Sequence, residues 1–313
     1  MDHIFKSSND QPKRDAEWRK RLEGLVPEQV ETKHVLVVGC GSVGSFMASE
    51  LIRSGVRRIT LVDPDIVEWA NLTRTVYTHA DLGRLKVEAL RDHILSIFPD
   101  INVRCFPKSI QEEGQFAWRL SDDFLSILKD ADLVISAVDL PKATGLINRY
   151  GYALDKPVVF VALYKGAKGG EVIVTIPEVT PCFHCSTGGV RKVAEDAGLE
   201  AVAQKNRDYG TNRLIAEVAL GSDIHFVCSA AIKIVLSLLA RGNTSGSLGD
   251  FMGKQLDGGC NFLMLGMEPD YFLFPSTHAA AVGQYAFQSI WAKTSTNPDC
   301  DVCGLPENRE NTA

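Results

Sequence analysis

Residues 35–44 read Val-Leu-Val-Val-Gly-Cys-Gly-Ser-Val-Gly, and this stretch decides the fold. The apolar run 34–38 predicts a buried strand, and residues 42–54 have the pattern of a helix that a glycine ends. A strand, a Gly-x-Gly-x-x-Gly turn and a helix in this order let the backbone approach a phosphate closely, and the helix N-terminus adds a positive dipole end. The alternative is tight packing of helix on sheet without a ligand. The predicted phosphate-binding glycines are Gly39, Gly41 and Gly44.

The rest of the chain alternates in the same way between apolar runs and helical patterns. Nearly wholly apolar strands between helices indicate a parallel sheet covered on both faces. We expect an α/β fold with a Rossmann-like, mostly parallel sheet that antiparallel strands continue. Further strands are predicted at 58–63, 101–106, 132–138, 157–163, 171–176, 261–266 and 271–275, and helices at 82–98, 224–240 and 279–293.

Composition divides the chain into one long domain with short extensions. Residues 1–33 are polar and rich in charge, and they predict an N-terminal arm. Residues 34–304 form the domain, and 305–313 form a C-terminal tail. Within the domain, a segment at about 186–222 is rich in charge and glycine and weakly periodic, which is typical of a functional or mobile crossover connection.

Bulk properties narrow the function classes. The net charge of -6 disfavours nucleic acid as the main partner. No apolar stretch is expected to reach the roughly 20 residues of a membrane span, and the polar start has no signal-peptide core. We therefore expect a cytoplasmic protein with no membrane partner, whose eight cysteines are reduced or bound to metal.

Charged residues after the glycine turn indicate which nucleotide is bound. Asp63 ends the next strand, 19 residues after Gly44, where a carboxylate can accept hydrogen bonds from ribose hydroxyls. Arg74 and Lys86 are predicted at the same edge of the sheet, and two cations there suit a triphosphate better than a dinucleotide. Asp139 follows the strand 132–138 and is a natural Mg²⁺ ligand. The alternatives are solvated surface cations and an aspartate that caps a helix.

Taken together, these motifs are similar to those of the ThiF/MoeB/HesA superfamily, the bacterial relatives of ubiquitin-activating enzymes. The resemblance rests on VVGCGSVGS, LVDPDIVEWANLTR, GRLKVEALRDHI, SAVD, PCFHC and NPDCDVCG, in that order from about 34 to 304. It implies that MgATP adenylates the C-terminal carboxylate of a ubiquitin-like or sulfur-carrier protein with a Gly-Gly tail, that pyrophosphate leaves, and that the enzyme is a homodimer.

The resemblance also implies a role for each matching residue. Asp63 holds the ribose, Lys86 stabilises charge in the transition state and Asp139 binds magnesium. No general base is required, because a carboxylate is already ionised at neutral pH. The implied catalytic residues are Arg74, Lys86 and Asp139, and the implied ATP-binding residues are Gly39, Gly41, Gly44, Asp63, Asp65, Asn71, Arg74, Lys86 and Asp139.

Two Cys-x-x-Cys pairs predict a structural zinc site. Cys182 and Cys185 form the first pair, and Cys300 and Cys303 form the second near the end of the chain. Four thiolates suit a closed tetrahedral zinc site, and the wide separation implies a clamp that ties the C-terminal segment to the domain. The alternatives are a redox motif, which needs only one pair, and unrelated thiols.

The segment from 186 to 227 contains no cysteine, whereas many members of the superfamily have a catalytic one in this region. Cys228 and Cys260 are the remaining candidates for a thioester, and buried cysteines are usually inert. The favoured interpretation is adenylation followed by transfer to another thiol or amine, with a conjugating enzyme or a sulfur donor as a further partner. A non-catalytic scaffold that binds a ubiquitin-like protein and an NAD-dependent oxidoreductase are the alternatives.

Overall fold

A mixed sheet runs through the part of the chain that the computed structural model describes, which is residues 17–112, 119–188, 218–268 and 286–304. Within these residues the sheet has eight strands in the order β3-β2-β1-β4-β5-β6-β7-β8. The first five pair in parallel, and β6, β7 and β8 continue the sheet in antiparallel pairs, as the sequence predicts. The strands are β1 (His34–Val38), β2 (Arg58–Val62), β3 (Asn102–Phe106), β4 (Leu133–Ser136), β5 (Val158–Leu163), β6 (Gly169–Thr175), β7 (Cys260–Gly266) and β8 (Gln288–Lys293).

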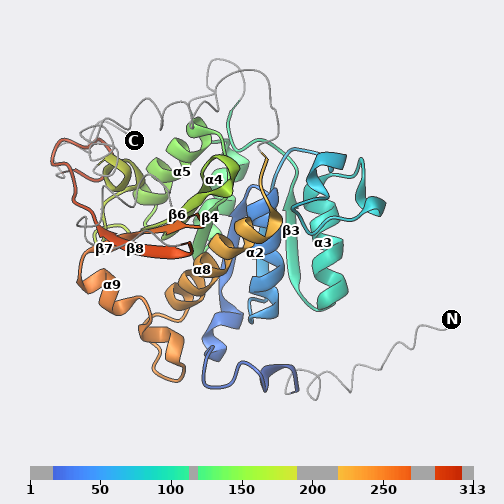
Figure 1. Cartoon of the computed structure of the whole chain (residues 1–313), viewed down its shortest axis with the longest axis horizontal. Coiled ribbons are helices and arrows are strands. Elements are labelled where there is room, and N and C mark those ends of the chain that lie inside the picture. The colour runs from blue at the N-terminus through green and yellow to red at the C-terminus, as the bar shows by residue number, and fades with distance from the viewer. Residues whose placement is uncertain (1–16, 113–118, 189–217, 269–285, 305–313) are drawn as a thin grey trace.

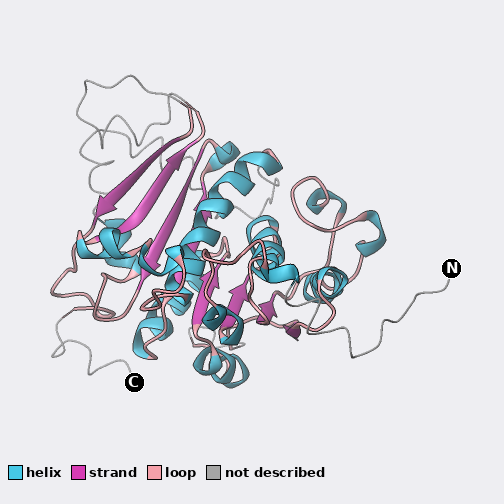
Figure 2. Cartoon of the chain, turned by 90° about the horizontal axis from the view of Figure 1, so that it is seen from below, coloured by secondary structure: helices cyan, strands magenta, loops and turns pink. Residues whose placement is uncertain are grey.

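Helices cover both faces of the sheet (Figure 1 and Figure 2). Helices α2, α3 and α8 pack on one face, and α4 and α5 pack on the other. In Figure 1, α2 and α8 lie side by side, and they pack against each other. The α-helices are α2 (Ser42–Arg53), α3 (Lys86–Ile97), α4 (Asp122–Asp130), α5 (Pro141–Ala153), α8 (Gly221–Leu239) and α9 (Gly253–Asp257), and the 3-10 helices are η2 (Glu28–Thr32), η3 (Trp69–Asn71), η4 (His79–Asp81), η6 (Lys165–Ala167) and η7 (Ser247–Asp250).

The apolar sequence of the central strand follows from this layering. Val35 and Val37 of β1 lie in the core under α2 and α8, whereas Leu36 and Val38 lie in the core under α4 and α5. All four side chains are buried, because successive residues of a strand point to opposite faces. A strand between two helical layers therefore has no polar face.

Strand order reverses between β1 and β4, and this reversal positions the site. Val38 of β1 pairs with Val62 of β2 on one side and with Ser136 of β4 on the other. The carboxyl ends of the three parallel strands therefore lie level at one edge. In open α/β sheets, ligands bind in the crevice at such a switch point.

Two predicted helices differ from the structure. Residues 288–293 form strand β8, not the end of a helix: Ile290 and Ala292 pack on one core and Trp291 packs on the other, which is the period of a strand. The helix predicted from residue 82 begins at Lys86, because Gly83 has a φ of 79° and Leu85 forms a β-bridge with Ile66. The strand predicted at 271–275 lies outside the described residues, as does most of the predicted crossover segment.

Helix α8 corrects the expectation that no stretch reaches the length of a membrane span. Its 19 residues, Gly221–Leu239, are long and apolar enough by length and composition, with a mean hydropathy of 1.6. Half of that stretch is buried inside the protein, where α8 packs on α2, β5 and β6. The core of the fold thus accounts for the apolar character of α8.

Candidate functional site

The glycine turn lies at the carboxyl edge of β1 and leads into α2. Gly39 has a φ of 93°, and a Cβ atom at Gly44 would lie 1.8 Å from the Gly39 carbonyl oxygen, so both positions require glycine. A Cβ atom at Gly41 would meet nothing within 4 Å, which leaves open space on that side of the turn. No described side chain caps α2, so its first N–H groups remain available to an anion.

Asp63 is fixed beneath the glycine turn. Its Oδ2 accepts a hydrogen bond from the backbone N–H of Cys40 at 2.7 Å, and its Oδ1 accepts one from the N–H of Asp65 at 2.9 Å. The side chain is buried, and this burial raises the pKa of Asp63, while Lys86 and the two N–H groups oppose the rise. Each carboxylate oxygen has two lone pairs, so both can accept a further hydrogen bond from a ligand hydroxyl.

Lys86, the first residue of α3, is held against two carboxylates. Its Nζ donates a hydrogen bond to Asp65 Oδ2 at 2.8 Å and lies 3.9 Å from Asp63 Oδ1. Burial alone would lower the pKa of Lys86, but the hydrogen bond to Asp65 and the charges of both aspartates raise it above its usual value. The ammonium group is therefore charged at neutral pH and lies next to the glycine turn.

Tyr77 belongs to this site, although the sequence analysis did not identify it. Its hydroxyl donates a hydrogen bond to the Cys40 carbonyl oxygen at 2.7 Å, and the Lys86 carbonyl oxygen lies 3.2 Å from the same hydroxyl. Burial raises the pKa of Tyr77 above its usual value, so the hydroxyl remains a donor. Tyr77 thus ties the glycine turn to the start of α3, and its place between the Arg74 and Lys86 motifs is the signal that could have revealed it.

Asn71 and Arg74 lie in a turn after β2. The Asn71 side-chain oxygen accepts a hydrogen bond from the N–H of Glu68 at 2.8 Å, and the Asn71 carbonyl accepts one from the N–H of Arg74 at 3.1 Å. Asn71 therefore shapes the turn that carries Arg74. The Arg74 side chain is half-buried.

Asp139 lies at the same edge, beyond the end of β4. The strand ends at Ser136, so two residues separate it from Asp139, which is exposed. The preceding residue, Val138, contacts the glycine turn: its Cγ1 lies 3.2 Å from the position of a Cβ atom on Gly39. Leu140 is the N-cap of α5 and no side chain caps that helix, so Asp139 does not act as a helix cap.

The four cysteines of the two Cys-x-x-Cys pairs come together in one cluster. Their sulfur atoms all lie within 4.8 Å of one another and could hold a metal ion. Sulfur–sulfur distances are 3.7 Å for Cys182 and Cys300 and 3.5 Å for Cys185 and Cys303. A tetrahedral metal with bonds of about 2.3 Å to sulfur requires separations of about 3.8 Å, so the cluster fits.

Neighbouring groups favour a thiolate at Cys182, whereas burial raises the pKa of Cys185 to about 11 and the hydrogen bond with Cys182 raises the pKa of Cys303. A hydrogen bond from the Cys303 side chain lowers the pKa of Cys182 to about 5. The backbone N–H groups of Asn297 and Val302 donate to Cys185 and Cys300 at 3.4 and 3.5 Å. Backbone donors of this kind stabilise negative charge on the ligand atoms and fix their direction.

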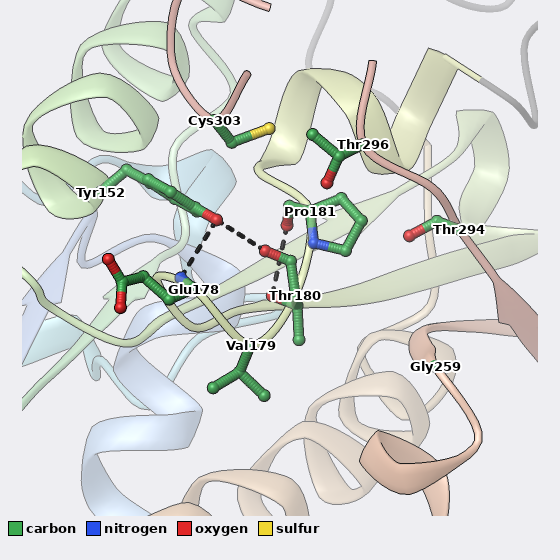
Figure 3. Close-up of a pocket in the computed structure, with 9 residues that line it drawn as sticks. All are labelled: Tyr152, Glu178, Val179, Thr180, Pro181, Gly259, Thr294, Thr296 and Cys303. Atoms are coloured by element: carbon green, nitrogen blue, oxygen red, sulfur yellow. Dashed lines mark hydrogen bonds between the residues drawn. The ribbon is translucent and has the colours of Figure 1, made fainter. Parts of the chain in front are cut away.

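A cavity of about 350 Å³ lies beside the cysteine cluster and apart from the glycine turn. Figure 3 shows Cys303 on its wall, together with the Tyr152 hydroxyl. That hydroxyl donates to the Thr180 carbonyl at 2.8 Å and accepts from the Glu178 N–H at 3.3 Å. The Tyr152 hydroxyl therefore already has a donor and an acceptor within the fold.

The remaining cysteines do not resemble activated nucleophiles. Cys40 is buried inside the glycine turn, and burial together with the Asp63 charge raises its pKa. Burial also raises the pKa of Cys105, and it raises that of Cys228 to about 12. A thiol held neutral is a poor nucleophile. Cys260 is half-buried, as is Cys105, whereas Cys40 and Cys228 are buried.

Comparison of the sequence with known proteins identifies the family of the chain. The model of the ThiF family matches residues 19–283. The adenylyltransferase and sulfurtransferase UBA4 of Candida glabrata is 34% identical over 152 residues, which cover 48% of this chain and 33% of that protein. The sulfur carrier protein adenylyltransferase of Thermus thermophilus is 32% identical over 164 residues, covering 50% and 56%. The ubiquitin-like modifier-activating enzyme 5 of Caenorhabditis elegans is 29% identical over 214 residues, covering 59% and 51%.

Solved structures share the fold over most of the chain. E. coli MccB with ATP superposes with a TM-score of 0.62 at 18% identity, covering 95% of this chain and 75% of MccB. PaaA superposes with a TM-score of 0.63 at 17% identity, covering 94% and 86%. At these identities the likeness concerns the fold alone. The curated relatives above are matched over a third to just over half of their own length.

Proposed function

The chain belongs to the ThiF family, and we propose that it is an adenylyltransferase that uses MgATP to activate the C-terminal carboxylate of a ubiquitin-like or sulfur-carrier protein. One observation carries the proposal: the charged Lys86 ammonium group is held beside Asp63, directly against the glycine turn. Relatives named adenylyltransferases and modifier-activating enzymes support the reaction class.

In this proposal the nucleotide lies across the carboxyl edge of β1, β2 and β4. The free N–H groups of α2 and the open side of Gly41 take the phosphates, and Asp63 takes the ribose hydroxyls. The exposed Asp139 carboxylate would hold a magnesium ion, which would neutralise phosphate charge. The fixed direction of Asp63 supports this orientation, because its two backbone hydrogen bonds leave only its remaining lone pairs for the ribose.

Catalysis then consists of positioning and charge stabilisation. The substrate carboxylate attacks the α-phosphorus, an acyl-adenylate forms, and pyrophosphate leaves. Lys86 and Arg74 stabilise the negative charge that develops on the phosphoryl oxygens. Lys86 leaves Asp65 to do so, and because Asp65 is largely exposed, that hydrogen bond is easily replaced by water.

The cysteine cluster is proposed to hold a structural zinc ion. The sulfur spacing and the backbone donors support this ion, and the four ligands leave no open position for catalysis. Bound zinc would tie the segment that carries Cys300 and Cys303 to the turn that carries Cys182 and Cys185. An ion pair at 2.8 Å between Asp301 and Arg149 of α5 connects the same segment to a neighbouring helix.

We further propose that the protein acts in the cytosol as a homodimer and passes the activated carboxylate to a conjugating enzyme or a sulfur donor. Buried, neutral Cys40 and Cys228 support transfer to a thiol on another chain. The exposed apolar side chains Ile66, Trp69 and Leu140, which follow β2 and β4, support docking of a protein partner beside the site.

Trapping the acyl-adenylate tests the reaction class. The protein is incubated with ATP, Mg²⁺, hydroxylamine and a small β-grasp protein that ends in Gly-Gly, and the partner is analysed by mass spectrometry. We expect a C-terminal hydroxamate that requires ATP and is lost when the partner's last glycine is removed. An unmodified partner across a panel of such proteins, with folded enzyme and bound ATP, would contradict adenylation and favour a scaffold.

A further inference from the structure

Helix α8 makes close contact with α2, the helix that begins at the glycine turn. The His225 ring stacks on Phe46 with ring centroids 3.8 Å apart. One turn later, Cys228 Sγ lies 4.0 Å from the Val43 carbonyl oxygen. Val43 and Phe46 belong to the first turns of α2, so these contacts fix the start of α8 relative to the glycine turn.

The first residue of α8 contacts a different part of the site. A Cβ atom at Gly221 would lie 3.3 Å from the Thr73 carbonyl oxygen and 3.5 Å from Arg74 Cα, so the helix backbone rests directly on the turn that carries Arg74. A distance of 3.3 Å is tighter than nine in ten contacts of real Cβ atoms, so a side chain at this position would push its neighbour by a few tenths of an ångström. Gly221 does not adopt a positive φ, so the close approach, and not the backbone conformation, favours glycine at this position.

These contacts occupy one face of α8. Gly221, His225 and Cys228 are spaced by four and three residues, which places them on one side of the helix. The first two turns of α8 therefore touch the Arg74 turn at one point and α2 at the next. Because α8 is 19 residues long and buried along most of one side, it is a rigid element between the two.

We infer that Gly221 is a positioning residue, which sets the distance between the Arg74 turn and the glycine turn and so places Arg74 on the nucleotide phosphates. This inference rests on the proposed function, because Gly221 affects the rate of the reaction only through the position of Arg74.

Gly221→Val tests the inference by ATP–pyrophosphate exchange with a Gly-Gly-tailed partner. The added side chain displaces Thr73 and Arg74, and we expect kcat/KM for ATP to fall about tenfold, because misplacement by an ångström costs up to about a hundredfold. In an Arg74→Ala background the same substitution is expected to change the rate less than about twofold, because the group through which it acts is gone. Gly221→Ala is expected to change kcat/KM in the same direction by a smaller factor.

Gly253→Val is the matched control. Gly253 is also the first residue of a helix, and a Cβ atom there would meet nothing within 4 Å. We expect wild-type kinetics from this variant. The inference would be overturned if Gly221→Val lowered kcat/KM by the same factor with and without Arg74. It would also be overturned if Gly253→Val lowered kcat/KM as much as Gly221→Val does.

A crystal structure of Gly221→Val separates failure of this inference from failure of the proposed function. If the wild-type protein shows no exchange with any partner, the proposed function fails. The effect of Gly221 on the position of the Arg74 turn can still be measured. If the inference is right, the crystal structure of Gly221→Val will show Thr73 and Arg74 shifted relative to α2, compared with the wild-type protein. Unchanged positions would overturn it whatever the activity.

Discussion

Asp63→Asn separates the role of the buried carboxylate from that of its exposed neighbour. In the native protein, each Asp63 oxygen accepts one backbone N–H, from Cys40 at 2.7 Å and from Asp65 at 2.9 Å. An asparagine of the same size has one oxygen, so its amide group must face the other N–H and one charge-assisted hydrogen bond is lost. Such a bond contributes roughly 1.5–3 kcal/mol.

Two further effects of Asp63→Asn offset each other. The Lys86 ammonium, 3.9 Å from Asp63, loses an attraction, but the cost of burying a charge, which raises the pKa of Asp63, is relieved. We therefore expect a net loss of about 2 kcal/mol in the free energy of unfolding. With an unfolding entropy near 2 cal/mol/K per residue, this loss in a chain of 313 residues corresponds to about 3 °C in Tm.

Differential scanning calorimetry measures the Tm shift, and Asp65→Asn is the control. Asp65 also pairs with Lys86, at 2.8 Å, but its side chain is 65% exposed, so its loss is expected to lower Tm by about 1 °C or less. Calorimetric titration with MgATP should show about tenfold weaker binding to Asp63→Asn, because an acceptor for a ribose hydroxyl is lost. Equal Tm shifts for the two variants, or unchanged ATP affinity of Asp63→Asn, would refute the reasoning.

Four further predictions concern the metal cluster, the reactivity and the titration of the thiols, and the catalytic cation. Cys300→Ser or chelation should lower zinc content, measured by atomic absorption, together with Tm, and an unchanged Tm in metal-free protein would count against a structural zinc ion. Iodoacetamide at pH 8 should label Cys260 in the native protein and leave Cys40 and Cys228 unlabelled in mass spectra. Because burial raises the Cys228 pKa from 9.0 to about 12, wild type should lose stability as pH rises through this window, and Cys228→Ala should lose less; parallel urea-denaturation profiles would contradict this. Lys86→Met should lower kcat of pyrophosphate exchange by about a hundredfold or more, whereas a change confined to KM would assign Lys86 to ground-state binding.

The parallel half of the fold could be predicted because both faces of each central strand are buried. An apolar run such as His34–Val38 then has one interpretation, and the glycine turn fixes the helix that follows. The helix predicted over the residues of β8 was wrong. Among the described residues β8 is the edge strand of the sheet, and it is only half-buried. Its residues Gln288–Lys293 sit in a sequence that also suits a helix, and only pairing with β7 settles the period.

Residues of the candidate site could be predicted where the charge of a side chain suits a nucleotide and its place in the chain puts it at the carboxyl edge of the sheet. Asp63 and Lys86 are brought together beside the glycine turn, as their places after β2 and at the start of α3 imply. Tyr77 was missed because its partners are backbone carbonyls, which no motif marks, so only its place between the Arg74 and Lys86 motifs points to it. The contact of Gly221 with the Arg74 turn is also invisible in the sequence, because about 150 residues separate the two and glycines have many roles.

Carboxylate adenylation is the central claim, and ATP–[³²P]pyrophosphate exchange tests it most directly. The assay uses wild-type protein and Asp139→Ala, each with small β-grasp proteins that end in Gly-Gly and with the same proteins lacking that tail. We predict exchange that requires the tail and is abolished in Asp139→Ala, while the variant keeps its fold and its metal content. Exchange that is absent with every partner, or that survives in Asp139→Ala at the wild-type rate, would contradict the account.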